Sequence, residues 1–174
     1  MLSPGENPRL LDRTDEGARI RERVGRDLSQ AMLREWNTLG IHLGYVYEGS
    51  PIVVPDGTPP QIADHAIYEQ TARPGSRAPH VWLADGRSTL DLFGRSFVFL
   101  ALGAAAPDFQ PLVSASELHA MPLKVVRLNE PAVRDAYEHP LVLVRPDGHV
   151  AWRGNRPPAD PMQVIDRVRG AALD

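Results

Sequence analysis

Apolar side chains recur at every fourth position between Asp15 and Leu39, and charged side chains fill positions between them. This period predicts one long amphipathic helix, with Thr14 or Asp12 capping its amino end and Gly40 ending it in a left-handed conformation. We expect the apolar stripe to lie on a hydrophobic core. The residues of this stripe are Ile20, Val24, Leu28, Met32 and Trp36.

Residues 41–48 alternate between apolar and other side chains, which predicts a half-buried strand. Prolines are then dense in SPIVVPDGTPP, residues 50–60, and a second irregular segment, ARPGSRAPH, ends at His80. We interpret residues 49–80 mostly as an ordered loop, because proline cannot sit inside a sheet. A loop of this length is unusual within a compact domain, so we expect its support to come from another part of the protein.

From Val81 onward, short apolar runs alternate with turn residues and helix signals. The sequence VWLADGRSTLDLF predicts two strands around a tight turn at Asp85-Gly86. The run FVFLAL, residues 97–102, is apolar on both faces, as in a central strand. The other predicted elements are a helix from Pro111 to His119, a strand from Leu123 to Leu128, a helix from Ala132 to Tyr137, a hairpin of Leu141–Val144 and His149–Arg153 around Pro146-Asp147-Gly148, and a helix that starts at Pro161 after the cap Asp160.

This order of elements predicts an α/β fold with a central mixed sheet and helices on both faces. One parallel crossover followed by an antiparallel hairpin is the topology of a thioredoxin-like domain. We therefore expect two parts: residues 1–80, with the long helix, a strand and the ordered loop, and residues 81–174, the thioredoxin-like domain. Proteins of that fold carry a cis-proline before the hairpin, and Pro140 stands at this position, so we predict a cis bond there.

Composition removes several classes of function. Nineteen basic and 22 acidic residues give the 174-residue chain a net charge of −3, so it has no basic excess with which to bind nucleic acid. Cysteine is absent, which excludes dithiol redox chemistry, disulfides and zinc–thiolate sites. No long apolar run or signal sequence is seen, so we expect a cytoplasmic protein with no membrane association.

The residues that could carry chemistry form no recognised catalytic motif. None of the six histidines stands at metal-binding spacing from another, and neither a G-x-S-x-G elbow nor a glycine-rich phosphate loop occurs. Asp85 and Asp91 could form an acid–base pair. We favour instead a turn role for Asp85 and an exposed strand position for Asp91.

Three strings carry a family resemblance: LGYVYEGSPIVVPDG, ARPGSRAPHVWLADGRSTLDLFGRSFVFL and LVLVRPDGHVAWRG. They resemble the C-terminal part of class A flavoprotein monooxygenases, the FAD-dependent aromatic hydroxylases related to phenol hydroxylase and the polyketide hydroxylases. The resemblance implies a parent enzyme that uses FAD and NAD(P)H to hydroxylate an aromatic ring. It also implies a thioredoxin-like C-terminal domain without redox cysteines, packed on the flavin and substrate domains.

The chain lacks both flavin-binding motifs of that family, so we expect no cofactor in this chain and no catalysis by the chain alone. Its partners would be the flavin and substrate domains, or a separate flavoprotein chain. Arg73, Arg77 and His80 are the candidate contacts with such a partner, or else shape a local turn. Tyr45, Tyr47 and Trp82 are interpreted as core residues. Loss of the partner domains would expose apolar surface, so we expect a homo-oligomer.

Two further readings stay open from the sequence. One is a free-standing interaction or regulatory module that docks on a separate flavoprotein hydroxylase. The other is a small hydrolase that uses His80 or His149 with a nearby carboxylate.

Overall fold

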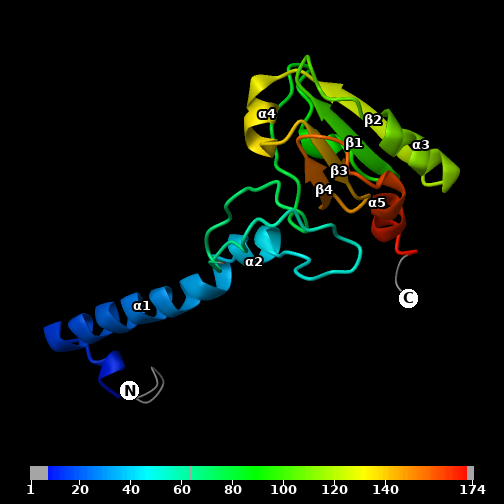
Figure 1. The fold of residues 1–174 in the computed structure, drawn as a ribbon. Coiled ribbons are helices and arrows are strands. Elements are labelled where there is room, and N and C mark those ends of the chain that lie inside the picture. Colours follow the sequence, from blue (N-terminus) through cyan, green and yellow to red (C-terminus); the bar gives the residue numbers. More distant parts are fainter. Residues whose placement is uncertain (1–7, 63, 172–174) are drawn as a thin grey trace.

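The computed structural model describes residues 8–62 and 64–171, so the first residues of the predicted N-terminal part, Ala63 and the last three residues lie outside the described structure. A four-stranded mixed sheet forms its centre, with the order β2-β1-β3-β4 (Figure 1). β1 pairs in parallel with β2, whereas β3 is antiparallel to both β1 and β4. The strands are β1 (Phe97–Leu102), β2 (Leu123–Leu128), β3 (Leu141–Val144) and β4 (Val150–Gly154).

β1 and β3 lie in the middle of the sheet, each with a strand on both sides. Accordingly, every residue of β3, and all but the first of β1, is buried. Alternate side chains of β1 enter two different cores. Phe99 and Ala101 pack on the face covered by helices α3 (Gln110–Leu118) and α5 (Pro161–Val168). Val98 and Leu100 pack on the other face, with helix α4 (Pro131–Tyr137) and residues 72–93. The sequence-based prediction of a mixed α/β sheet with helices on both faces is therefore confirmed.

The helix signals read from the sequence also hold locally. The Asp160 carboxylate accepts the N–H of Gln163 at 2.9 Å and caps α5. Proline opens both α4 and α5, where its missing N–H costs nothing.

The predicted cis bond at Pro140 is wrong. No peptide bond among the described residues is cis, and the His139–Pro140 bond is trans. A trans bond is the ordinary state of an X–Pro peptide. The chain direction changes one residue earlier, where Glu138 adopts a φ of 65° at the end of α4. The Pro140 carbonyl then accepts the N–H of Leu102 at 2.8 Å.

The N-terminal half consists of a short turn of helix, η2 (Pro8–Leu11), then α1 (Asp15–Trp36) and α2 (Leu39–Gly44). Thr14 caps α1 by accepting the N–H of Gly17. The predicted strand over residues 41–48 is wrong: its first part is α2, and the rest is irregular. The Thr38 carbonyl accepts the N–H groups of Ile41 and His42, so local helical bonds form where no neighbouring strand is available.

The two strands predicted around Asp85-Gly86 are reduced to a single bridge between Trp82 and Ser88. The turn itself is present, and the Asp85 carboxylate accepts the N–H of Arg87. A second short helix, η3 (Thr89–Leu92), replaces the returning strand. Asp91 closes the capping box of this helix instead of lying on a strand. None of the helices in residues 8–62 and 64–171 is long and apolar enough to cross a membrane.

Candidate docking surface

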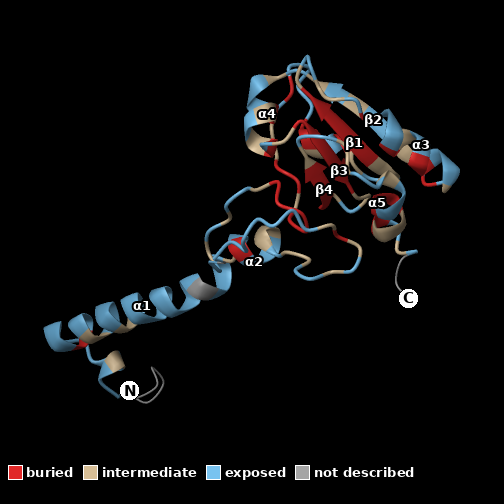
Figure 2. Ribbon diagram, viewed as in Figure 1, coloured by how far each residue is buried: buried red, intermediate tan, exposed pale blue. Residues whose placement is uncertain are grey.

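Exposed large apolar side chains gather in the N-terminal half of the described chain, whereas the central strands of the sheet domain are red, or buried, in Figure 2. Residues 97–171 expose few of them, namely Leu118, Val125 and Met162. Residues 28–82 expose many, and they come from α1, α2 and the loops that follow. These residues are Leu28, Met32, Leu33, Trp36, Leu39, Ile41, Tyr45, Ile62, Ile67 and Trp82. We call this set the apolar arm surface.

Helix α1 carries much of the apolar arm surface and extends away from the sheet domain (Figure 1). Its main packing partner within the described residues is η2. The Trp36 side chain is 79% exposed and Met32 is 48% exposed. The expectation that this stripe lies on a core is therefore wrong for the chain taken alone. The apolar face of an amphipathic helix is normally buried, so we expect a surface outside this chain to cover the apolar face of α1.

The irregular segments are better supported than the sequence suggested. Two main-chain hydrogen bonds join the loop at residues 75–76 to Val150. The Gly75 N–H donates to the Val150 carbonyl, and the Val150 N–H donates to the Ser76 carbonyl. The Val54 N–H donates to the Ala151 carbonyl, so two loop segments attach to β4. Part of residues 49–80 thus rests on this chain's own hairpin and not on an outside surface.

Buried arginines hold these loops. Arg153, with a side chain only 3% exposed, binds the carboxylates of Asp56 and Glu138, both at 2.6 Å. Its Nη2 also donates to the Thr58 hydroxyl. Burial alone would raise the pKa of Asp56, but hydrogen bonds from Thr58 and Arg153 outweigh it and lower that pKa to about 2.

Among the three candidate contact residues, Arg73 faces inward. Its side chain is about 10% exposed and forms two hydrogen bonds with the Glu48 carboxylate, at 2.7 and 2.9 Å. The hydrogen bond from Arg73 lowers the pKa of Glu48. Arg77 is half-buried and its main chain bridges to His149. These two positions serve the local packing of the loop, and the structure does not bring them together with His80 in one exposed patch.

His80 lies beside the most prominent aromatic side chain of this region. Its ring meets Trp82 edge to face, with the ring centroids 4.8 Å apart. The Nδ1 atom is 2.7 Å from the Ser88 hydroxyl. The Trp82 side chain is 69% exposed, so its interpretation as a core residue is wrong. Side chains point alternately to opposite sides along extended residues 81–83. Since Leu83 is buried, the neighbouring Trp82 side chain faces away from the core, and this alternation was the sequence signal for its exposure.

A second aromatic group surrounds His149. The ring centroids of Tyr45 and Tyr47 lie 5.0 and 4.8 Å from the centroid of the His149 imidazole. The Tyr45 hydroxyl donates a hydrogen bond to the Tyr47 hydroxyl. That bond and burial raise the pKa of Tyr47 to about 12. His149 is buried, and burial lowers its pKa. Tyr45 is 49% exposed, which also corrects its assignment to the core.

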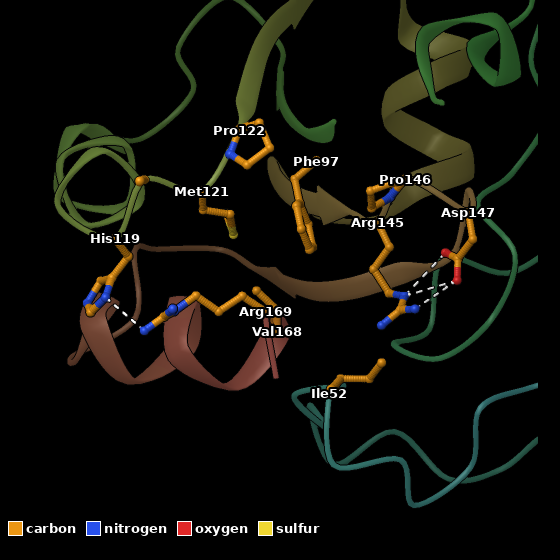
Figure 3. Close-up of a pocket in the computed structure, with 11 residues that line it drawn as sticks. Ile52, Phe97, His119, Met121, Pro122, Arg145, Pro146, Asp147, Val168 and Arg169 are labelled. Atoms are coloured by element: carbon orange, nitrogen blue, oxygen red, sulfur yellow. Dashed lines mark hydrogen bonds and ion pairs between the residues drawn. The ribbon is translucent and has the colours of Figure 1, made fainter. Parts of the chain in front are cut away.

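The largest cavity among those described holds about 530 Å³ and opens between α5, the turn before β2 and the β3–β4 turn (Figure 3). Phe97, Met121 and Val168 form its apolar wall. At one end Arg145 is held by Asp147, and at the other Arg169 donates to the His119 Nδ1 atom at 3.1 Å. The arginines and the aspartate of the lining are thus each paired within the chain.

The crossover from β1 to α3 does not suit the diphosphate of a flavin cofactor. In a parallel crossover, a diphosphate binds where the first strand leads into its helix. Here the Asp108 carboxylate accepts the N–H of Gln110 at 2.9 Å, and Pro111 has no N–H, so a diphosphate would meet like charge and a missing donor. Within residues 8–62 and 64–171, no group of histidine and carboxylate side chains could hold a metal ion.

Comparison with known proteins gives a consistent family. Residues 71–172 match the family model described as "Aromatic-ring hydroxylase, C-terminal". A putative polyketide hydroxylase of Streptomyces coelicolor is 36% identical over 155 residues, which cover 78% of this chain and 24% of that protein. The FAD-dependent monooxygenase apdD of Emericella nidulans is 38% identical over 128 residues, covering 68% of this chain and 20% of that protein.

Solved structures extend the likeness to nearly the whole chain. RebC-10x, solved native and with K252c bound, superposes with a TM-score of 0.83 at 43% identity over 95% of this chain and 31% of that one. The rebeccamycin biosynthetic enzyme RebC with reduced flavin gives a TM-score of 0.81 at 42% identity. The chain thus spans about a fifth to a third of the length of these relatives.

Proposed function

This chain belongs to the aromatic-ring hydroxylase family, matching its C-terminal domain, and from this premise we propose that it packs against the flavin- and substrate-binding domains of an FAD-dependent aromatic monooxygenase. In this proposal the chain is not catalytic by itself. FAD and NAD(P)H belong to the partner domains, and the hydroxylated substrate is an aromatic ring. The role of this chain is to cover and stabilise the flavin- and substrate-binding domains.

The apolar arm surface is the observation that carries this proposal. Both hydrophobic cores of the sheet domain are buried within this chain. In contrast, α1 and the loops after it leave large apolar side chains exposed to water. Exposed apolar surface on this scale marks a binding interface. The relatives are about three to five times as long as the matched region, which supports their remaining domains as the partner.

We also infer that the sheet domain is a thioredoxin-like fold that has no redox cysteines. The β1-α3-β2-α4-β3-β4-α5 order and the strand directions support this. We propose the boundary between the two parts before residue 71 and not at residue 80, because Ala72 and Ala78 lie in the core of the sheet domain. The cytoplasm is the compartment that we propose, in keeping with a chain that has no cysteine.

A hybrid protein tests the proposal. The flavin- and substrate-binding part of RebC is joined to this chain at the start of the superposed region, and RebC truncated at the same residue is the control. We expect the hybrid to retain FAD and to unfold in one transition with release of FAD. The truncated protein should lose FAD or aggregate. A hybrid in which this chain unfolds separately, with FAD release unchanged from the truncated control, would contradict the proposal.

A further inference from the structure

We propose that Trp82, positioned by His80, is the anchor by which the sheet domain docks on the flavin- and substrate-binding part of the hydroxylase. This inference rests on the proposed function and adds the residue pair that would carry a large share of the contact. It starts from the fact that Trp82 keeps its ring in water while the residues on both sides of it are held in the domain.

The main chain beneath Trp82 is rigid. Val81 and Thr89 are joined by two bonds: the Thr89 N–H donates to the Val81 carbonyl, and the Val81 N–H to the Thr89 hydroxyl. The Pro79 carbonyl accepts hydrogen bonds from the Thr89 and Tyr137 hydroxyls, at 2.7 and 2.9 Å. Thr89 and Tyr137 are fully buried, so the Trp82 backbone is fixed to η3 and α4.

His80 orients the ring. The Ser88 hydroxyl accepts the Leu90 N–H at 3.0 Å within the capping box of η3. The same hydroxyl is hydrogen-bonded to the His80 Nδ1 atom, at 2.7 Å, which fixes the position of the imidazole. The imidazole then packs against Trp82 at an interplanar angle of 83°. A tryptophan held in this way loses little side-chain entropy on binding, which is typical of interface hot spots.

The position of Trp82 indicates its partner. The Gln70 side chain accepts the His80 N–H, which links this platform to residues 61–70, where Ile62 and Ile67 are exposed. The His65 carbonyl accepts the Gly40 N–H of α2, which continues the surface to α1. Hydrogen bonds thus connect the segment that carries Trp82 with the segments that carry Ile62, Ile67 and α2, and the same partner would cover all of them.

The chemistry of the pair defines what it would meet. The indole presents a flat apolar face and one N–H donor beside the His80 imidazole. Such a pair fits an apolar recess edged by carbonyl or carboxylate oxygens. The recess would lie on the flavin- and substrate-binding part of the enzyme.

The test places Trp82→Ala in the RebC hybrid and in this chain alone. Leu118→Ala is the matched control, because Leu118 is 77% exposed on α3, outside the apolar arm surface. We expect Trp82→Ala to lower the temperature of FAD release from the hybrid by roughly 3 °C or more, and to shift the unfolding of the isolated chain by less than about 1 °C. Leu118→Ala should shift neither.

Other outcomes separate this inference from the proposed function. If the hybrid holds FAD but Trp82→Ala behaves as Leu118→Ala does, the anchor is refuted and the proposed function stands. If Trp82→Ala destabilises the isolated chain equally, Trp82 is a structural residue and the inference fails. If it lowers self-association of the isolated chain but leaves FAD release from the hybrid unchanged, the partner is a second copy, which also overturns the inference.

Discussion

At the scale of single residues, charge pairs hold the irregular segments to the sheet. Arg153 reaches from β4 to Asp56 and Thr58 in one loop and to Glu138 at the end of α4. No periodicity in the sequence predicts such a contact between residues almost a hundred positions apart. The sequence analysis found the loop from its prolines but not the arginine that fixes it.

Replacement of Arg153 tests this role. Arg153→Met should lower the free energy of unfolding by about 3 kcal/mol, because it leaves the largely buried Asp56 carboxylate without its cation. Arg87→Met removes an exposed ion pair with Asp85, which solvent screens, and should cost far less. Urea unfolding followed by fluorescence compares the two. Equal costs would show that the buried pair does not hold the loop.

The buried His149 and the half-buried His139 predict a pH dependence. Burial lowers the pKa of His149 and of His139, so the folded protein favours their neutral forms. Their contribution to stability is complete above the ordinary histidine pKa of about 6.5 and is lost as the pH falls below it toward the folded pKa values. The urea midpoint should therefore decrease from pH 8 to pH 5.5. His149→Phe should flatten this decrease, and an unchanged slope would count against the burial effect.

At the scale of elements, the sequence predicted those helices and strands that the pattern of neighbouring residues determines. β1 and β3 are continuous apolar runs, and Asp160 with Pro161 is a strong helix start, so these elements were found. Residues 41–48 alternate as a strand does, but a strand needs a neighbour to pair with, and the chain offers none there. The surroundings, not the pattern, decided the outcome.

Helix α1 was predicted correctly as a helix, but its partner could not be predicted, because a stripe of apolar residues does not identify the surface that covers it. In the isolated chain, Leu28→Gln combined with Met32→Gln should change the free energy of unfolding of the sheet domain by less than about 0.5 kcal/mol, since both side chains are already exposed. Leu112→Ala, in the core, should cost about 3 kcal/mol. A large loss in the α1 variant would mean that α1 packs on the sheet domain.

At the scale of the whole molecule, a closed sheet domain carries an arm whose apolar side is uncovered (Figure 2). Such a surface should drive the isolated chain to self-associate as its concentration rises. Sedimentation velocity should show oligomers that the Leu28→Gln and Met32→Gln changes reduce. A chain that stays monomeric at all concentrations would argue against an apolar interface on the arm.

Amide hydrogen exchange along α1 addresses the proposed packing most directly. In the isolated chain, the amides of α1 should exchange freely while those of β1 and β3 are protected. In the RebC hybrid, we predict that α1 exchanges at least about a hundredfold more slowly and that the central strands are unchanged. Equal exchange of α1 in the two proteins would contradict the account, because the arm would then have no partner in the assembled enzyme.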